Sequence, residues 1–201
     1  MGESSRVVDL GFAELQVPPG THVCQIYSGP DERDDALLRF VARGLRNGES
    51  TACFSDNIDA DAIESWLAKD GVSLSAEVDA GRFTLSAASE VYFRDGRFDP
   101  ERVIGLLTEF HEESVRAGRL AARVIGEMSA EIDRVPGGSR LMEYEARVNG
   151  LLRTHPVTAV CQYDARAFPG ATIMDVLAVH PMVLMRGTVI HNPFFVPLQS
   201  S

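Results

Sequence analysis

The feature that most constrains this chain is a regular alternation of short apolar runs with segments of helical periodicity. Five apolar runs, at 22–27, 50–55, 82–86, 121–125 and 157–163, are separated by helices predicted at about 31–47, 59–71, 75–80, 100–118, 139–152 and 171–179. Runs such as TAVCQY show no polar alternation, which is typical of strands buried on both faces of a parallel sheet. We therefore predict an α/β fold with a mostly parallel sheet. Residues 182–185 and 189–191 are predicted to add a C-terminal antiparallel hairpin.

The length and composition indicate a single hydrophobic core. The chain has 201 residues, of which 45% are hydrophobic, and it contains no repeat or low-complexity run. We expect one domain over residues 20–197. An N-terminal extension at 1–19 is expected to be partly disordered, to about Leu10, and the tail at 198–201 to be disordered.

Charge and cysteine content restrict the partners of the chain. The net charge is −10, so we expect no nucleic-acid partner, because phosphate contacts need a clustered basic face. The sequence has neither an apolar run of membrane-spanning length nor a signal peptide, so we expect no membrane partner. The three cysteines, Cys24, Cys53 and Cys161, are widely spaced within apolar runs, which is typical of reduced, buried thiols. The chain is therefore expected to be cytoplasmic.

The sequence lacks the usual motifs of nucleotide binding and catalysis. A phosphate loop needs a lysine after a strand, and the only lysine, Lys69, lies near the end of a predicted helix. The glycine pattern of dinucleotide-binding folds, a nucleophile elbow and a C-x-x-C pair are absent as well. The segment HEESV has Val115 where a zinc-binding helix would carry a second histidine. We expect no catalytic residue and no cofactor.

Polar residues gather where the predicted strands end. Tyr27 ends the first strand, Asp56 ends the second, Glu127 follows the fourth, and Tyr163 and Asp164 end the fifth. Ligands of open α/β sheets bind beyond the carboxyl ends of the strands. These residues therefore predict a binding site at that edge for a small, partly apolar molecule or a cation. The alternative is structural: the carboxylates cap backbone amides, and the tyrosines are core aromatics whose hydroxyls reach solvent.

His22 and Cys24 lie two apart on the first strand and therefore share one face of the sheet. A metal needs at least one further ligand, for which Cys161 is the candidate on a neighbouring strand. The alternative is a buried thiol beside a hydrogen-bonded histidine, and we adopt it. The sequence-based expectation is thus that the chain has no metal site.

Six motifs along the chain are informative together: HVCQIY at 22–27, YFRDGRFDPERV at 92–103, GEMS at 126–129, EYEARVN at 143–149, CQYD at 161–164, and HP followed by NPFF within 180–195. In this order they resemble one known family, the methanogen/methylotroph DcmR sensory (MEDS) domain. The resemblance implies a RecA/KaiC-like three-layer α/β/α fold that has lost the phosphate loop. It also implies a signal-input role in sensing simple hydrocarbon derivatives. The residues that match family motif positions, and thereby become candidate ligand-binding residues, are His22, Cys24, Tyr27, Glu127, Tyr163 and Asp164.

The leading hypothesis is a non-catalytic sensory domain in which a small molecule shifts the population of two conformers. The segments 87–99 and 129–138 are the expected moving parts. Because little chain follows the expected domain, the signal is expected to pass to a separate protein, such as a histidine kinase or an anti-sigma factor; homodimerisation is left open. Two alternatives are a ligand-independent interaction scaffold and an enzyme that uses Glu127 or Asp164 as a base.

Overall fold

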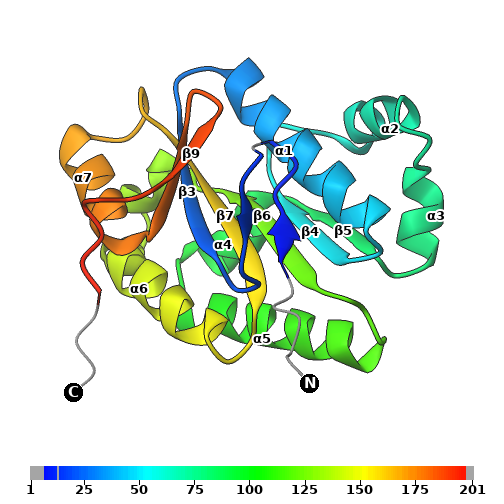
Figure 1. The fold of residues 1–201 in the computed structure, drawn as a ribbon. Coiled ribbons are helices and arrows are strands. Elements are labelled where there is room, and N and C mark those ends of the chain that lie inside the picture. Colours follow the sequence, from blue (N-terminus) through cyan, green and yellow to red (C-terminus); the bar gives the residue numbers. More distant parts are fainter. Residues whose placement is uncertain (1–6, 13, 198–201) are drawn as a thin grey trace, which may run out of the picture.

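A seven-stranded sheet forms the middle layer of the structure, a computed structural model that describes residues 7–12 and 14–197 (Figure 1). Its strand order is β5 (Phe83–Ser86), β4 (Ser50–Phe54), β6 (Ala122–Glu127), β7 (Val157–Asp164), β3 (His22–Tyr27), β8 (Met182–Met185) and β9 (Thr188–His191). Neighbouring strands are parallel except β8 and β9, which form an antiparallel pair. The predicted mostly parallel sheet and C-terminal hairpin are confirmed.

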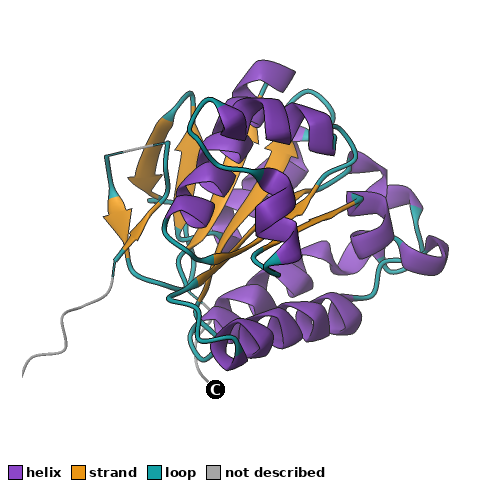
Figure 2. Ribbon diagram, turned by 90° about the vertical axis from the view of Figure 1, so that its right-hand side faces the viewer, coloured by secondary structure: helices purple, strands orange, loops and turns teal. Residues whose placement is uncertain are grey.

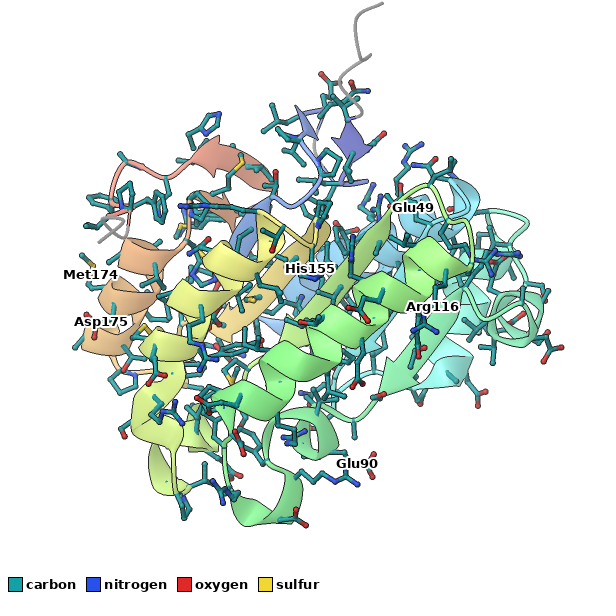
Figure 3. The ribbon with its side chains drawn as sticks, turned by 90° about the horizontal axis from the view of Figure 1, so that it is seen from below. Glu49, Glu90, Arg116, His155, Met174 and Asp175 are labelled. Atoms are coloured by element: carbon teal, nitrogen blue, oxygen red, sulfur yellow. The ribbon has the colours of Figure 1, made fainter. Side chains whose placement is uncertain are left out.

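Helices cover both faces of this sheet (Figure 2). One face carries α1 (Pro30–Arg46), α2 (Ala60–Ala68) and α3 (Leu74–Asp79), and the other carries α4 (Ala88–Tyr92), α5 (Pro100–Arg116), α6 (Leu141–Leu152) and α7 (Gly170–Val179). Two of these helices begin at a side-chain cap: Asp59 accepts from the Ala62 amide at 2.8 Å, and Asp99 accepts from the Arg102 amide at 3.3 Å. Seen from below, α5 and α6 cross the sheet, with Arg116 on α5 and His155 just after α6 (Figure 3).

Side chains that alternate along the strands form two separate cores. Cys24 of β3 and Cys161 of β7 contribute to the core under α4–α7, whereas their neighbours Val23 and Val160 contribute to the core under α1–α3. This follows from the period of two in a strand, which sends successive side chains to opposite faces. Each strand residue is thereby assigned to one face, and this decides which side chains can form a common site.

The segments before β3 and after β5 contain structure that the sequence did not predict. Strands β1 (Val8–Asp9) and β2 (Gln16–Val17) pair with each other, and Val8, Leu10 and Val17 are buried in the α1–α3 core. Hence residues 7–10 of the expected disordered extension pack on the domain. Residues 1–6 and 198–201, where disorder was also expected, lie outside the described residues. The segment 87–99, which is one of the expected moving parts, contains α4, because apolar side chains such as Tyr92 and Phe98 are buried there.

Helix α1 packs on the side chain of Arg123, which belongs to β6. Gly44 allows this approach, since a Cβ at that position would lie 2.6 Å from Cδ of the fully buried Arg123. Arg123 Nε donates to Glu49 Oε2 at 2.7 Å, and its Nη1 donates to the Phe40 carbonyl at 3.0 Å. These contacts hold the second half of α1 against the amino end of β6. The first turns of α1 thus lie near the carboxyl end of the same strand.

Candidate functional site

A cavity of about 240 Å³ lies at the carboxyl edge of the sheet. Its lining residues come from strand ends and from the segments that follow them: Tyr27, Asp56, Asn57, Ala88, Glu127, Met128, Ser129, Ala130, Asp164, Ala167 and Phe168. The structure brings Tyr27 and Asp164 together because they are partners in the register of β3 and β7, and Glu127 ends the neighbouring strand β6. Three of the six candidate ligand-binding residues therefore line one cavity.

Glu127 has four side-chain partners at this edge, and we call the group of Glu127, Tyr27, Arg33, Ser55 and Asn57 the Glu127 hub. Its Oε1 accepts from the Tyr27 hydroxyl at 2.9 Å and from Arg33 Nη1 at 3.3 Å. Its Oε2 accepts from the Ser55 hydroxyl at 2.8 Å, and Asn57 Nδ2 lies 2.9 Å from both oxygens. The carboxylate thus joins β3, α1, β6 and the segment after β4, and the Arg33 guanidinium balances its charge.

The Tyr27 hydroxyl is held in its protonated form. Burial, followed by the charge of Glu127 and the hydrogen bond to it, raises the pKa of Tyr27 above the ordinary value of 10.0. The hydroxyl therefore donates to Glu127 throughout the physiological pH range. Its lone pairs remain available to accept a hydrogen bond from a molecule in the cavity.

The cavity suits a small ligand with apolar and polar parts. Met128, Ala130 and Phe168 are among the residues that form the apolar part of the cavity wall, and Asp56 and Asp164 contribute carboxylates to it. Its volume is below the roughly 300–1,000 Å³ that pockets for drug-sized ligands occupy. The carboxylates make the edge unfavourable for phosphate groups because like charges repel.

Asp56 and Asp164 also perform local structural roles. Asp56 accepts from the Ser89 amide at 3.0 Å and from the Ser89 hydroxyl at 2.8 Å, which caps the start of α4. Asp164 accepts from the Arg166 amide at 2.9 Å. The structural alternative considered for Asp164 thus coexists with its position on the cavity wall.

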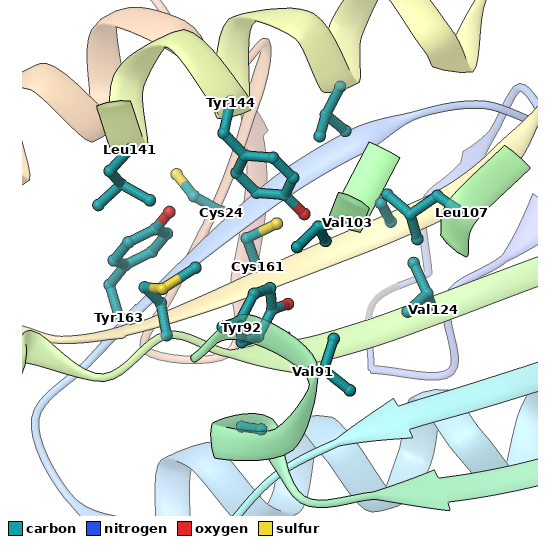
Figure 4. Close-up of a cluster of buried hydrophobic side chains, with 14 of the residues drawn as sticks. Cys24, Val91, Tyr92, Val103, Leu107, Val124, Leu141, Tyr144, Cys161 and Tyr163 are labelled. Atoms are coloured by element: carbon teal, nitrogen blue, oxygen red, sulfur yellow. The ribbon is translucent and has the colours of Figure 1, made fainter. Parts of the chain in front are cut away.

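The other three candidate residues do not lie at this cavity. The expectation that two tyrosine hydroxyls share one binding site at the strand ends is therefore wrong. Tyr163 is the register partner of Ile26, and both face the α4–α7 core, whereas Tyr27 and Glu127 face α1. The Tyr163 hydroxyl donates instead to Oε1 of Glu145 on α6. His22 and Cys24 are on the Tyr163 side as well, and Figure 4 shows Cys24, Cys161 and Tyr163 together on that face.

The α4–α7 face holds a second polar group, which we call the Glu145 cluster: His22, Glu145, Cys161 and His180, all buried. His22 Nε2 lies 3.3 Å from Glu145 Oε2 and 3.3 Å from Cys161 Sγ. His180 Nε2 lies 3.4 Å from the same Glu145 Oε2. Burial, followed by the neighbouring His180, lowers the pKa of His22, and burial raises the pKa of the Cys161 thiol.

Sequence reasoning missed the residues that complete both groups. Arg33 and Asn57 complete the Glu127 hub, and Glu145 and His180 complete the Glu145 cluster. A signal for Glu145 was present, because it lies four residues after Leu141 and three before Val148 and so belongs to the inward stripe of α6. His180 stands in the HP motif, but nothing in the sequence places it near β3.

Solved structures of low sequence identity share the fold. The flagellar accessory protein FlaH from Methanocaldococcus jannaschii is 12% identical, with a TM-score of 0.66 over 91% of this chain and 83% of that one. A KaiC-like protein from Pyrococcus horikoshii OT3 is 13% identical, with a TM-score of 0.63 over 90% of this chain and 80% of that one. The fold is therefore RecA/KaiC-like, as the resemblance implied. Within the described residues, no helix is both long and apolar enough to cross a membrane.

Sequence comparisons assign the family. The transcriptional repressor DcmR from Methylorubrum extorquens is 24% identical over 182 residues, which cover 84% of this chain and 61% of the repressor. The chain thus spans about three fifths of the length of that relative. The family model for the methanogen/methylotroph, DcmR sensory domain matches residues 21–181, which include both the Glu127 hub and the Glu145 cluster. The chain therefore belongs to the MEDS domain family of sensory domains.

Proposed function

We propose that this chain is a non-catalytic sensory domain that binds a small, partly apolar molecule in the cavity at the carboxyl edge. The observation that carries the proposal is that the cavity wall combines the Glu127 hub with both segments expected to move. Ala88 comes from the 87–99 segment, and Ser129 and Ala130 come from the 129–138 segment. A bound molecule would therefore contact both segments at once.

The mechanism is a population shift. A ligand changes a conformational equilibrium only when it binds one conformer more tightly than the other. A molecule that hydrogen-bonds Tyr27 and packs on Phe168 favours the conformer in which the two segments close the cavity. The surface formed by those segments then changes its affinity for a separate regulatory protein, such as a histidine kinase or an anti-sigma factor.

The lining indicates the chemical class of the ligand. Tyr27 and Asn57 offer hydrogen bonds, Asp56 and Asp164 favour a positive group, and the apolar wall favours a short hydrocarbon chain. Short-chain alcohols, alkylamines and related hydrocarbon derivatives combine these properties. We take residues 20–197 as the sensory unit, and the three buried free thiols fit a reducing cytoplasm.

A thermal-shift panel of short-chain alcohols, alkylamines and haloalkanes tests this proposal. At least one compound should raise the Tm of the wild-type protein, because binding to the folded state stabilises it by mass action. Tyr27→Phe and Glu127→Gln should each reduce that rise relative to the Tm of the same variant without compound. Glu113→Gln, which alters an exposed carboxylate on α5, is the matched control and should respond like the wild type. If the rise in Tm is unchanged in both site variants, the compound does not bind in this cavity.

One observation favours a second candidate, a ligand-independent scaffold. Both oxygens of Glu127 are already engaged by side chains of the chain, so the hub is complete as an internal anchor. In that case the whole panel would leave the Tm of the wild type unchanged. Native mass spectrometry of the purified protein would also find no small molecule retained.

A further inference from the structure

We propose that the Glu145 cluster is a metal site, in which His22 Nε2, His180 Nε2, Cys161 Sγ and Glu145 Oε2 bind one divalent cation of the zinc class. These four atoms all lie within 4.8 Å of one another. They come from β3, the C-cap of α7, β7 and α6, which are far apart in the sequence. The proposal departs from the sequence-based expectation of no metal, which considered only His22, Cys24 and Cys161.

The distances between the ligand atoms match a tetrahedron around zinc. Zinc bonds of about 2.0–2.3 Å imply separations of about 3.4 Å between nitrogen and oxygen ligands and about 3.6 Å for pairs that include sulfur. Glu145 Oε2 lies 3.3 Å from His22 Nε2, 3.4 Å from His180 Nε2 and 3.7 Å from Cys161 Sγ. His22 Nε2 lies 3.3 Å from Cys161 Sγ. Three of the six distances between ligand atoms therefore already match those around a shared central ion, and the distance from His22 Nε2 to Cys161 Sγ is about 0.3 Å shorter than the ion requires.

The second nitrogen of each imidazole is fixed as a donor. Asn149 Nδ2 donates to the Val179 carbonyl at 2.6 Å, so its Oδ1 faces His22 Nδ1 at 3.1 Å and can only accept. His180 Nδ1 donates to the Val176 carbonyl at 2.8 Å. A neutral imidazole with a proton on Nδ1 has a lone pair on Nε2. Both Nε2 atoms lie within 3.4 Å of the same carboxylate oxygen, and outer hydrogen bonds from Nδ1 are typical of metal-bound histidines.

His180 supplies an independent observation that points to a ligand at the cluster. The residue is fully buried, and among the described residues its Nε2 has no hydrogen-bond partner. A buried nitrogen without a partner is unfavourable, and such groups in native proteins are rare. An ion at the centre of the cluster would satisfy this nitrogen together with the other three ligand atoms.

A divalent ion would also balance the charge. Glu145 is fully buried, and no arginine or lysine in the described part of the chain forms an ion pair with it. A carboxylate, a thiolate and two neutral imidazoles carry two negative charges, which one divalent cation neutralises. Tyr163 donates to Glu145 Oε1 and so leaves Oε2 free for the ion.

The site is closed, which indicates a structural metal. All four positions of a tetrahedron are filled by the protein, whereas catalytic zinc keeps one position for water or substrate. The ion would join β3, β7, α6 and the end of α7 on the face of the sheet opposite the Glu127 hub. The inference is therefore independent of the proposed ligand cavity.

Metal content and spectroscopy of the full chain test the proposal. The tag-free protein, purified without chelator, should contain about one zinc per chain by elemental mass spectrometry. A strong chelator should remove it and lower the Tm, because a metal bound only by the folded state stabilises that state. Cobalt added to the stripped protein should produce the visible bands of a tetrahedral ion and a thiolate charge-transfer band in the near ultraviolet.

Substitutions assign the ligands. Cys161→Ser should abolish the charge-transfer band, and His180→Gln should reduce metal content. Cys53→Ser, which alters a fully buried thiol in the other core, is the control and should keep both the charge-transfer band and the metal content. If Cys161→Ser does not fold, X-ray absorption on the zinc-loaded wild type decides, with one sulfur and three nitrogen or oxygen neighbours expected. A protein that contains no metal and takes up none overturns the proposal, as does a metal shell without sulfur.

Discussion

Two buried glutamates, Glu127 and Glu145, lie on opposite faces of the same sheet and differ in what balances their charge. Each accepts a hydrogen bond from a tyrosine, Tyr27 in one case and Tyr163 in the other. Glu127 is paired with the guanidinium of Arg33. Glu145 has no arginine or lysine partner among the described residues, and two imidazoles and a thiol surround it.

This difference separates a carboxylate whose charge an arginine balances from one that, among the described residues, no arginine or lysine balances. The Glu127 hub has its cation and its hydrogen-bond donors from the chain itself, so the neighbouring cavity can remain open for an exchangeable ligand. The Glu145 cluster reaches neutrality only when it gains positive charge, as a proton or as a metal ion. Its burial suits a permanently bound ion, whereas the edge position of Glu127 suits a reversible signal.

The largest expected effect compares the same substitution at the two glutamates. Glu145→Gln should lower the free energy of unfolding of the metal-loaded protein by about 3–5 kcal/mol, since it leaves the positive charge of the proposed ion under-compensated in a fully buried cluster. Glu127→Gln should cost about 1–3 kcal/mol, because Arg33 keeps its contact with Asp34 at 2.7 Å. Urea unfolding at neutral pH measures both values. Equal costs, or the reverse order, would contradict the distinction between the two sites.

A smaller, pH-dependent effect concerns Tyr27. At neutral pH, Tyr27→Phe should lower the free energy of unfolding by about 1–2 kcal/mol through the lost hydrogen bond to Glu127. The folded-state pKa of Tyr27 is raised above the unfolded value of 10.0, so its stabilising contribution is complete below pH 10 and is lost as the pH rises further. Above pH 10, this residue should therefore lower the free energy of unfolding of the wild type by about 1.4 kcal/mol per pH unit. The variant lacks this contribution.

Unfolding curves measured between pH 8 and about pH 11.5 check this expectation. The other three tyrosines are present in both proteins and contribute equally to the alkaline loss of stability. The difference between wild type and Tyr27→Phe should therefore shrink above pH 10. Two curves that stay parallel over the whole range would show that the Tyr27 hydroxyl is not held by Glu127 in solution.

Much of the fold follows from local patterns in the sequence. The runs at 22–27 and 182–185 match β3 and β8 at both ends, and the helices predicted at about 59–71 and 100–118 contain α2 and α5. The errors fall where tertiary contacts override local composition. Asp and Arg residues make 87–99 look like a loop, yet Tyr92 and Phe98 are buried and α4 forms there.

The candidate site was only partly predictable, for a geometric reason. Strand ends identified Tyr27, Glu127 and Asp164, because parallel strands of one sheet end at one edge. The period of two in β7 sends Tyr163 to the other face, and periodicity applied to each strand alone does not show which partner it meets. The Glu145 cluster needs residues from α6 and the α7–β8 junction, whose packing on β3 is a property of the whole fold.

Asp164, a third carboxylate on the sheet, has the smallest expected effect on stability. Its side chain is 22% exposed, and its ion-pair partner Arg166 is 61% exposed. Asp164→Asn should therefore change the free energy of unfolding by less than about 0.5 kcal/mol. Because Asp164 lines the cavity without being part of the Glu127 hub, the substitution should still weaken the thermal response to alkylamines more than the response to alcohols. A large loss of stability, or an equal effect on both compound classes, would show that the cavity wall is a structural element like the two buried glutamates and does not select the charge of a ligand.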